Sequence, residues 1–556
     1  MDRSSACIVL CECPGHHDTK KVHGIRGILA GHGIDCQCIR DFCSLEVFSR
    51  FVEEIKLKKY SALFIVGCGF ELAGDYLGKT LKMESPGLDV TWENLGASSD
   101  DLEIAAKIIA WYNAVPISKS EVTEKKHFDK KVPRVLVIGG GVGGCQAALD
   151  LAEGGHEVVL VEKTLSLGGN MAKLDKTFPT LDCSICILGP RLVEVANHGN
   201  IELLTPAEVK VVRGSPGNYN VRVVVWPRFV DMTKCSGCGK CADVCPIVIP
   251  SEWNLGMKPV KAIHINFEQA VPLRSAITKE FCVECRLCEK VCERDAVCLD
   301  DRPVEQELEV GAIVMATGAK PFSPVSYGAY GYGYIPAVIT NMEFERLVCA
   351  TGPTGGRLIT PEGAPARTIA FIQCVGSRNE RFNRYCSGYC CTASIKEAIL
   401  ALEHEAYGHI TVFYNDIRTA GKGFEELYQR AIEKGVRFIK GIPSRLEEDP
   451  YTKQPIIHYY DMNEGKRGKL PVDLAVLAVG LVPDESGIDW ELSTGPEVDE
   501  HGFYKEREKT LHSLKSNLEG VFFLGTCHGP RDITQTVGEA SGVAAEVQSF
   551  LNEKEF

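Results

Sequence analysis

The sequence predicts an α/β fold made of two units of the dinucleotide-binding type, with a small cysteine-rich domain inserted into the first unit. Three observations predict this arrangement. A buried strand, a glycine-rich turn and a helix follow one another from Val135, and a weaker copy of this pattern begins at Thr368. Between them lie eight cysteines at regular spacing, from Cys235 to Cys292. A chain of 556 residues is long enough for about three or four domains.

The composition is that of a water-soluble globular protein. Hydrophobic residues make up 45% of the chain and charged residues 24%, and the net charge of −13 disfavours nucleic acid and anionic membranes as partners. No apolar stretch approaches the roughly 20 residues that a membrane helix needs, so we expect no direct membrane insertion. Twenty-five cysteines without a signal peptide indicate a reducing compartment, and we therefore expect a cytoplasmic protein.

Residues 1–116 are expected to form a separate N-terminal α/β domain, followed by a polar linker at 117–132. Four cysteines lie at the strand ends and turns of this domain and could hold one [4Fe–4S] cluster: Cys11, Cys13, Cys43 and Cys68. Spacing alone leaves an equal alternative, in which they are buried small apolar residues. Seven other cysteines of the chain are interpreted as buried or free thiols: Cys7, Cys36, Cys38, Cys145, Cys298, Cys349 and Cys374.

The first dinucleotide-type unit begins at residues 133–230. Its strand Val135–Ile138 runs into the turn Gly139-Gly140-Gly141-Val142-Gly143-Gly144, which precedes a helix. Glycines at such a turn let the backbone approach a pyrophosphate at the N-terminus of the helix. A second strand ends in Glu162, 23 residues after Gly139, where an acid can accept a hydrogen bond from a ribose hydroxyl. The alternative is a glycine turn in an unrelated α/β fold.

Residues 302–364 and 481–556 are expected to return to this unit. They contain VGAIVMATGA (310–319) and GVFFLG (520–525), and a Gly/Ala-rich helix follows the second segment. Together these segments resemble the flavin-binding domain of thioredoxin-reductase-like flavoproteins, although Thr526-Cys527 replaces the acid of that family. The resemblance implies FAD and a chemistry centred on the flavin, with Arg531 near it and no assigned catalytic side chain. The FAD contacts that it implies are Gly139, Gly141, Gly143, Gly144, Glu162, Lys163, Gly169, Thr317, Gly318, Gly525, Asp532 and Ile533.

The cysteine-rich insert occupies residues 231–301. Its two runs have the spacing with which bacterial two-cluster ferredoxins bind a pair of [4Fe–4S] clusters, where the fourth cysteine of each run crosses to the other cluster. The first predicted ligand set is Cys235, Cys238, Cys241 and Cys292, and the second is Cys282, Cys285, Cys288 and Cys245. Two zinc sites are the alternative, but four cysteines per run at this step fit zinc poorly. Insertion into the first unit is expected to place both clusters beside the flavin.

The second dinucleotide-type unit is expected at residues 365–480. Its strand Thr368–Gln373 is followed by Cys374-Val375-Gly376-Ser377-Arg378, where the glycines needed for a close pyrophosphate contact are absent. We therefore expect a fold kept without its nicotinamide, and the alternative is a working NAD(P)H site.

A further cysteine set belongs to these two units. It supplies five thiols for the four ligand positions of one more cubane: Cys183, Cys186, Cys386, Cys390 and Cys391. We expect the first four as ligands, with Cys391 nearly equal to Cys390 for the last position. The alternative is a redox dithiol formed by Cys183 and Cys186.

These pieces, in this order, resemble the A subunit of heterodisulfide reductase. Agreement outside the cysteine motifs carries the resemblance, in the segments at 136–144, 178–195, 267–273, 374–391 and 414–431. It implies a thioredoxin-reductase-like flavoprotein with two dinucleotide-binding domains, an inserted two-[4Fe–4S] ferredoxin domain and an extra N-terminal α/β cluster-binding domain. FAD and four [4Fe–4S] clusters are the expected cofactors. Larger members carry a second ferredoxin after the flavin domain, so one electron exit is expected to be missing or to come from a partner.

The resemblance also implies partners and a function. The partners are ferredoxin, other subunits of a heterodisulfide-reductase-like complex, and a hydrogenase- or dehydrogenase-type electron donor subunit, within a dimer of the complex. The flavin would split or merge electron pairs between clusters of different potential, and the heterodisulfide chemistry would belong to a different polypeptide of the complex. Two alternatives stay open: a passive electron relay toward a quinone-linked complex, and a free-standing NAD(P)H oxidoreductase.

Overall fold

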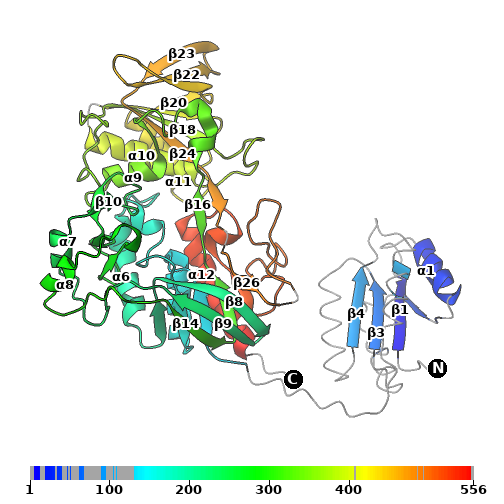
Figure 1. Cartoon of the computed structure of the whole chain (residues 1–556). Coiled ribbons are helices and arrows are strands. Elements are labelled where there is room, and N and C mark those ends of the chain that lie inside the picture. The colour runs from blue at the N-terminus through cyan, green and yellow to red at the C-terminus, as the bar shows by residue number, and fades with distance from the viewer. Residues whose placement is uncertain are drawn as a thin grey trace. The chain divides into compact units, whose positions relative to one another are not determined.

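The computed structural model describes residues 131–405, 408–484, 486–492 and 494–552, and in the N-terminal part residues 6–12, 19–31, 34, 36–40, 47, 51, 62–67, 89–94, 104–105 and 108. The chain divides into two compact units. One unit comprises Met1–His127 with Lys554–Phe556, and the other comprises Phe128–Glu553. Figure 1 shows the whole chain.

The described part of the first unit contains a parallel sheet in the order β2-β1-β3-β4. The bounds are β1 (Ala6–Glu12), α1 (Thr19–Gly31), β2 (Gln37–Arg40), β3 (Ala62–Gly67) and β4 (Asp89–Asn94). One face of α1 packs Val22, Ile25 and Leu29 against Ile8 and Leu10 of β1. The α/β class predicted for the N-terminal domain is confirmed for these residues.

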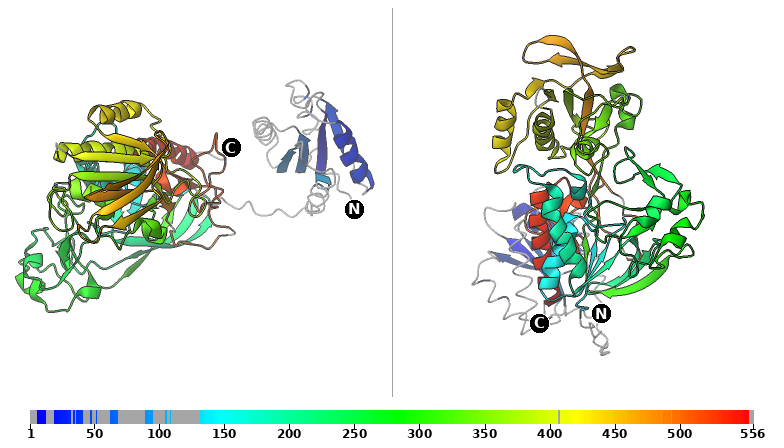
Figure 2. Two further views of the ribbon diagram at one scale, coloured as in Figure 1. Left: turned by 90° about the horizontal axis from the view of Figure 1, so that it is seen from above. Right: turned by 90° about the vertical axis from the view of Figure 1, so that its left-hand side faces the viewer.

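The second unit begins with a five-stranded parallel sheet in the order β27-β15-β5-β6-β7. The strands are β5 (Val135–Ile138), β6 (Val158–Val161), β7 (Ile201–Leu204), β15 (Ala312–Met315) and β27 (Val521–Phe523). Every residue of β5, β6, β15 and β27 is buried, as expected of parallel strands that are covered on both faces. The helices that pack with one face are α5 (Val142–Glu153), α6 (Ser184–Asn197) and α12 (Ile533–Asn552), the last drawn in red in Figure 2.

A second, mostly antiparallel sheet covers the other face of the parallel sheet. It has the order β14-β9-β8-β26, and its core residues pack with those of β5 and β6. The strands are β8 (Ala207–Ser215), β9 (Asn218–Val225), β14 (Val304–Val310) and β26 (Asp489–Trp490). Val225 at the end of β9 pairs with Val304 at the start of β14. The chain between them therefore leaves and re-enters at one point, which confirms the predicted insertion between neighbouring strands.

The insert is a small lobe whose two short helices, α7 and α8, are labelled at the left of Figure 1. Its elements are α7 (Lys240–Val244), β10 (Val248–Pro250), β11 (Pro259–Lys261), β12 (Ile263–Ile265), β13 (Ser275–Ile277), η2 (Lys279–Phe281) and α8 (Leu287–Val291). Its core contains Val230, Ile263, Ile277 and Ala296, and five cysteines of the runs pack against this core.

The second dinucleotide-type unit has its own five-stranded parallel sheet, in the order β17-β24-β18-β19-β20. The strands are β17 (Val338–Thr340), β18 (Thr368–Val375), β19 (His409–Tyr414), β20 (Arg437–Lys440) and β24 (Leu474–Val479). The helices are α9 (Asn341–Val348), α10 (Cys390–His404) and α11 (Phe424–Glu433). Beside it lies a three-stranded antiparallel sheet of β21 (Arg445–Glu448), β22 (Pro455–Asp461) and β23 (Lys466–Pro471), at the top of Figure 1.

The boundary between the two dinucleotide-type units differs from the one that the sequence predicts. The sequence places residues 302–364 in the flavin-type unit, but β17 pairs with β24 of the other sheet, and α9 packs into that core. The crossing points are β16 (Ala319–Pro321) and β25 (Leu481–Pro483), which pair antiparallel. The second unit therefore starts just after β16. The periodicity could not reveal this, because β17 is only three residues long.

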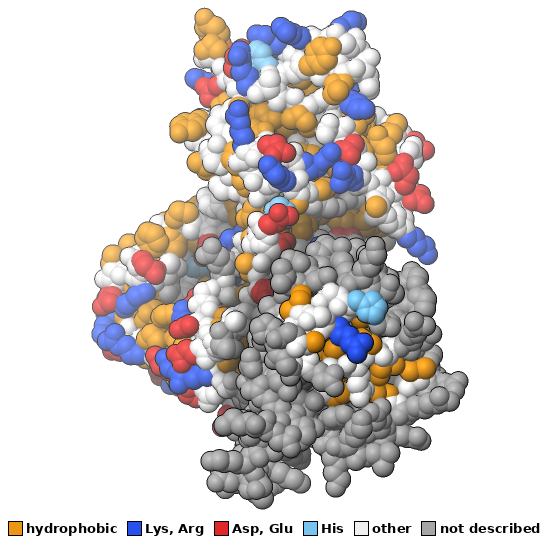
Figure 3. Space-filling model, turned by 90° about the vertical axis from the view of Figure 1, so that its right-hand side faces the viewer, with side chains coloured by type: hydrophobic (Ala, Val, Ile, Leu, Met, Phe, Trp, Pro, Cys, Tyr) orange, Lys and Arg blue, Asp and Glu red, His pale blue; other side chains and the backbone are white. Residues whose placement is uncertain are grey.

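The surface of the tip formed by β21, β22 and β23 mixes apolar and charged groups. Tyr451 is 93% exposed and Met462 is 57% exposed, and Figure 3 shows hydrophobic side chains beside basic ones at the top of the molecule. Among the residues that the structure describes, no helix combines the length and the apolar character needed to cross a membrane.

Candidate cofactor sites

The glycine turn after β5 is shaped by its own backbone. Gly139 has φ +110°, and a Cβ added there would collide with the carbonyl of Ala316 at the end of β15. A Cβ on Gly144 would collide with the carbonyl of Gly139. Gly141, which caps α5, faces open space, so the backbone at the N-terminus of α5 is accessible to a ligand. Each glycine thus has a separate reason to be glycine, as a pyrophosphate site requires.

Glu162 lies at the end of β6 and is 6% exposed. Its Oε2 accepts a hydrogen bond from the Gly140 amide at 2.7 Å, and its Oε1 accepts from the amide and the hydroxyl of Thr164 at 2.7 and 2.8 Å. A carboxylate oxygen has two lone pairs, so Oε2 can accept a second bond from a ribose. Glu162 therefore holds the glycine turn in place in addition to the predicted contact with a nucleotide.

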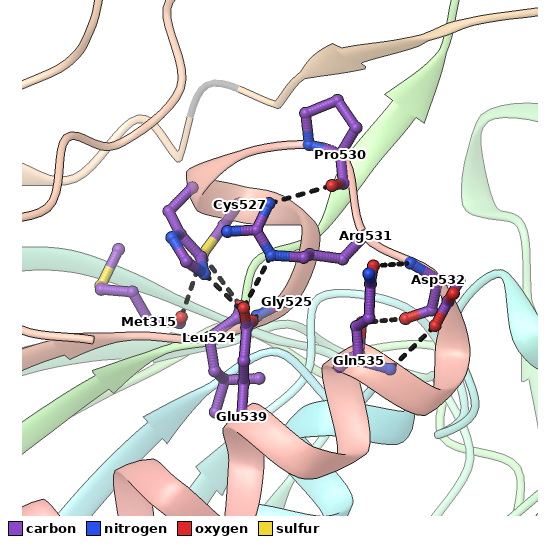
Figure 4. A network of polar contacts seen from close by, with 11 residues as sticks. Met315, Leu524, Gly525, Cys527, Pro530, Arg531, Asp532, Gln535 and Glu539 are labelled. Carbon is purple, nitrogen blue, oxygen red and sulfur yellow. Dashed lines mark hydrogen bonds and ion pairs between the residues drawn. The ribbon is translucent and has the colours of Figure 1, made fainter. Parts of the chain in front are cut away.

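The turn between β27 and α12 is organised around Glu539, as Figure 4 shows. Its Oε2 accepts from the Gly525 amide at 2.8 Å and from His528 Nε2 at 3.0 Å, and its Oε1 accepts from Arg531 Nε at 2.7 Å. Burial raises the pKa of Glu539, but His528 and Arg531 outweigh it and bring this pKa down to about 2. Glu539 is thus a carboxylate that fixes Gly525 and Arg531, both of which the sequence predicts as flavin-site residues.

The other predicted residues of this turn have structural partners. Asp532 accepts from the amide of Gln535 at 2.8 Å and so caps the start of α12, where Ile533 is the first residue. Cys527, which replaces the family's acid, is buried, and its thiol donates to the carbonyls of Met315 and Leu524 (Figure 4). Burial raises the pKa of Cys527 to about 12, so it stays a thiol.

These residues fit a flavin nucleotide. The Thr317 hydroxyl and His528 Nδ1 are buried and have no hydrogen-bond partner within the described residues. Thr317 belongs to the predicted Thr317-Gly318 turn after β15, and Gly318 has the φ of +76° that this turn needs. His528 and Glu539 were missed by the sequence analysis, because their role depends on contacts across the turn. Two buried polar atoms without partners in the chain are what a site for a polar cofactor requires.

Lys163, another predicted FAD contact, is engaged elsewhere. Its ammonium lies 2.5 Å from Asp484, which also binds Lys320 at 2.5 Å. Although burial raises the pKa of Asp484, the hydrogen bonds from the two lysines lower it overall. Lys320 belongs to β16 and Asp484 follows β25, so this ion pair fastens the flavin-type unit to the crossing strands. Gly169, also predicted, lies against Gly141 of the glycine turn.

The two cysteine runs of the insert adopt the same backbone conformation. The residues two and four places after the first cysteine are left-handed in both runs: Gly237 and Gly239 in the first, Glu284 and Arg286 in the second. A left-handed conformation costs a non-glycine residue about 1–3 kcal/mol, so the second run adopts this loop at a measurable cost. Each run is followed by a five-residue helix, α7 or α8. The matching loops indicate two equivalent binding loops.

One cavity of the insert supports the crossed assignment. It is lined by Cys282, Cys285 and Cys288 of the second run and by Cys245, the last cysteine of the first run. Cys292, the last cysteine of the second run, packs against the same core as Cys235 and Cys241. Among the described residues, no three His, Cys, Asp or Glu side chains are arranged to hold a single metal ion.

The cysteines of the second unit form a different set from the one that the sequence predicts. Four cysteines lie close enough to raise one another's pKa values, and they are Cys374, Cys386, Cys390 and Cys391. Burial raises the pKa of Cys390 well above its usual range, and the other three thiols raise it further. Cys374, which the sequence analysis interprets as a buried or free thiol, has a left-handed φ of +62° at the turn after β18. This cysteine quartet offers four thiols without any contribution from the first unit.

The two remaining predicted ligands are bonded to each other. Cys183 and Cys186 form a disulfide at the start of α6. The N-terminal set is largely outside the described residues: Cys13, Cys43 and Cys68 are not described, and of Cys11 only the backbone, in β1, is described.

The turn after β18 is filled by the chain's own side chains. A Cβ on Gly376 would collide with the ring of Phe322, and Asn383 donates to the Gly376 carbonyl at 2.7 Å. Phe322 packs edge-on against Phe382, which stacks with Tyr327. This aromatic group occupies the place where a dinucleotide would approach the backbone, in contrast to the open face of Gly141.

Buried charges join the two units. Lys396 of α10 and Glu345 of α9 form an ion pair at 2.5 Å, and both side chains are 1% exposed. Lys396 also donates to the Lys176 carbonyl at 2.8 Å, and Glu345 accepts from the Asp175 amide at 3.0 Å. Burial raises the pKa of the neighbouring Glu397 well above 4.5, and the charge of Glu345 raises it further. The cluster therefore holds one lysine and one carboxylate, with Glu397 in its neutral form.

The parallel sheet, the glycine turn and the terminal helix define a dinucleotide-binding oxidoreductase fold. The family model described as "Pyridine nucleotide-disulphide oxidoreductase" matches residues 133–346. Thioredoxin reductases of Lactococcus lactis and T. acidophilum resemble the structure with TM-scores of 0.43 and 0.44 and identities of 16% and 13%. These matches cover 75% and 76% of this chain, and 98% and 99% of those chains.

The chain belongs to the family of heterodisulfide reductase A subunits. It is 38% identical to a protein of Archaeoglobus profundus that is named as similar to this A subunit, over 512 residues, which is 83% of this chain and 72% of that relative. It is 45% identical to the A subunit of the "H(2):CoB-CoM heterodisulfide,ferredoxin reductase" of Methanothermobacter marburgensis over 415 residues. That match covers 74% of this chain and 63% of the relative, so the chain spans less than two thirds of its length.

Proposed function

We propose that this chain is the FAD- and iron–sulfur-containing electron-transfer subunit of a heterodisulfide-reductase-like oxidoreductase complex. The main support for this function is the insertion of two cysteine loops between β9 and β14. That sheet packs on the parallel sheet whose strand β5 carries the open glycine turn. Electron centres in the insert would thus be held within one compact unit with the flavin.

FAD exchanges electrons singly or in pairs, and so it can couple a two-electron donor to one-electron clusters. The chain's own residues would supply its binding and its environment. The glycine turn and the N-terminus of α5 would receive the pyrophosphate, and Glu162 would accept from the ribose. His528 Nδ1, held by Glu539 through the other ring nitrogen, would offer a polar contact at the start of α12. The proposed role of the flavin is to split or merge electron pairs between clusters of different potential.

We assign four [4Fe–4S] clusters to the chain. Two belong to the insert with the crossed ligand sets, and one belongs to the N-terminal domain with Cys11, Cys13, Cys43 and Cys68. The fourth is assigned to the cysteine quartet, in place of the set that used Cys183 and Cys186. The reason is that the quartet is complete in itself, while Cys183 and Cys186 are bonded to each other.

The proposed partners follow from the names of the relatives. One relative is named for H2, CoB-CoM heterodisulfide and ferredoxin, and another is the A subunit of the "Ferredoxin/F(420)H(2)-dependent CoB-CoM heterodisulfide reductase" of Methanosarcina acetivorans. We therefore propose a hydrogenase- or dehydrogenase-type donor subunit, ferredoxin and a separate heterodisulfide-reducing subunit, in a dimer of the complex located in the cytoplasm. The closed turn at Gly376 disfavours a free-standing NAD(P)H oxidoreductase.

Anaerobic iron, sulfide and flavin analysis of the reconstituted chain tests the cofactor content. Four cubanes contain about 16 iron atoms, and one flavin per chain is expected. Saturation near 8 iron atoms would restrict the clusters to the insert. Stopped-flow mixing with reduced ferredoxin should reduce the flavin rapidly, whereas NADH should leave it oxidised. A fast reaction with NADH would favour the reductase alternative instead.

Cys245→Ala tests the crossed ligand sets. The variant should lose the cluster of the Cys282–Cys288 run, because Cys245 lines the cavity of that run. EPR of the reduced insert clusters, compared with Cys292→Ala, separates the two sites. Loss of the cluster bound by Cys235, Cys238 and Cys241 in the Cys245→Ala protein would show that the fourth ligands do not cross.

A further inference from the structure

The disulfide between Cys183 and Cys186 lies on a firmly anchored base. The side chain of Ser184 is fully buried and donates to the Met171 carbonyl at 2.7 Å. Leu188, Leu192 and Val195 of α6 are buried in the core of the flavin-type unit. The bond is thus attached to a rigid 14-residue helix, so its position is fixed relative to the fold.

The outer side of the pair faces solvent. Cys186 is exposed, Cys183 is half-buried, and the next residue, Ile187, is 49% exposed. A thiol from outside can therefore reach the disulfide at Cys186 without any opening of the core. This accessibility distinguishes the pair from the other thiols of the unit such as Cys145 and Cys527, which are at most 3% exposed.

The start of α6 stabilises one sulfur as a thiolate. Cys183 is the N-cap residue, and the amide of Cys186 donates to its sulfur at 3.3 Å. The positive end of the helix dipole adds to this hydrogen bond, and both favour a negative charge on Cys183. Cys183 is accordingly a good leaving group when Cys186 is attacked.

We propose that Cys183 and Cys186 form a thiol–disulfide exchange site that accepts electron pairs from, or returns them to, an external dithiol. In the reducing direction a thiolate of the external dithiol attacks Cys186 Sγ. A mixed disulfide forms, the bond to Cys183 breaks, and its electron pair remains on Cys183 as a thiolate. The second thiolate of the dithiol then attacks its own sulfur in the mixed disulfide and releases Cys186. Two electrons thus move to the pair, and the external dithiol becomes a disulfide.

A static crosslink would explain the pair less well. A disulfide between residues three apart closes a very short loop, so it restricts the unfolded chain far less than a long-range bridge does. A cluster-ligand role is also not needed, because the cysteine quartet already supplies four thiols. An exchange site uses both the exposure of Cys186 and the helix N-terminus at Cys183.

Differential alkylation of the cofactor-loaded chain under anaerobic conditions tests the proposal. The native protein is labelled with iodoacetamide before and after treatment with dithiothreitol, and the peptide containing residues 183–186 is followed by mass spectrometry. Cys183 and Cys186 should be labelled only after reduction and always together, with iron and flavin contents unchanged. Cys298, which is exposed and outside any disulfide, is the internal control and should be labelled before reduction.

Two further measurements complete the test. Cys183→Ser should keep all its iron and flavin, and its remaining Cys186 should form a mixed disulfide with an aromatic disulfide reagent about tenfold faster than buried Cys145 does. Loss of about four iron atoms from this variant would make Cys183 a cluster ligand and overturn the proposal. Resistance of the bond to dithiothreitol until the protein unfolds would identify a static crosslink and overturn it equally. A low flavin or iron content of the unmodified chain would instead count against the proposed function alone.

Discussion

The two dinucleotide-type units share an architecture and differ at one turn. Both have a five-stranded parallel sheet, and in both the central turn follows a buried strand, β5 or β18. After β5 the backbone is bare, and Gly141 faces open space. After β18 the corresponding turn carries Cys374, and Phe322 covers Gly376. A nucleotide site therefore depends on a few residues of one turn, while the sheet beneath it can be kept for another purpose.

The second unit also has polar groups that a nucleotide site does not explain. Its turn brings Cys374 to the three cysteines at the start of α10, and its helices α9 and α10 bury an ion pair against the first unit. The first unit thus presents backbone amides to a ligand, and the second presents thiols. Four predictions test this contrast, beginning with the largest expected effect.

The first prediction concerns the open turn. Gly144→Ala should abolish FAD binding, because the new Cβ would collide with the Gly139 carbonyl. Overpacking of this kind costs about 1–3 kcal/mol of folding stability, which leaves the fold intact in a typical domain. Flavin absorbance after gel filtration measures the effect, and circular dichroism checks the fold. The matched substitution Gly538→Ala, at an open position of α12, should retain FAD. Full flavin occupancy in Gly144→Ala would refute a close pyrophosphate contact.

The second prediction concerns the buried charges between the units. Lys396→Met leaves Glu345 buried without its counter-ion, and should reduce the free energy of unfolding by about 3–5 kcal/mol. Urea unfolding measures the change. The double variant Lys396→Met/Glu345→Gln should recover most of the loss, because no unpaired charge remains. Equal destabilisation of the single and double variants would show that the pair matters only through packing.

Glu397→Gln is the control for this cluster. Glu397 is neutral in the folded protein, so its replacement by Gln should change stability at pH 5 by less than about 1 kcal/mol. The raised pKa makes the folded state bind more protons than the unfolded state, so this group lowers the stability as pH rises above 4.5. The Gln variant should therefore lose less stability than the parent chain between pH 5 and 8.

The third prediction concerns the turn before α12. Because the pKa of Glu539 is lowered to about 2 from 4.5, its contribution is present above pH 4.5 and is lost as pH falls toward 2. A shift of this size corresponds to up to about 3 kcal/mol. Glu539→Gln should lose that contribution at pH 7 and show a shallower decline of stability below pH 4.5. Parallel pH profiles for both proteins would show that Glu539 does not stabilise this turn.

Much of this arrangement could be predicted from local sequence. The strand Val135–Ile138, the glycine turn and the acid at Glu162 lie within about thirty residues of one another, as this motif requires. The cysteine runs of the insert are also local, and their spacing alone separates them into crossed sets. Such features depend on neighbouring residues, and so the pattern contains them.

Other features depend on contacts between distant segments. Glu345 and Lys396 have no shared motif, yet α9 and α10 bring them together in the core. Cys374 is a single cysteine in the sequence, and only the left-handed turn after β18 turns it toward the start of α10. Glu539 gains its meaning from Gly525 and His528 across the turn before α12. Hydrophobic periodicity contains no information on such pairs.

The fourth prediction concerns the cysteine quartet, which occupies the turn of the second unit where the first unit has its nucleotide turn. Iron and flavin analysis of Cys374→Ala, beside Cys183→Ser, tests this difference most directly. We expect Cys374→Ala to lose about four iron atoms, the content of one cubane, and to keep its FAD, while Cys183→Ser keeps both. Full iron in Cys374→Ala together with a loss of iron in Cys183→Ser would contradict the assignment of a cluster to the quartet.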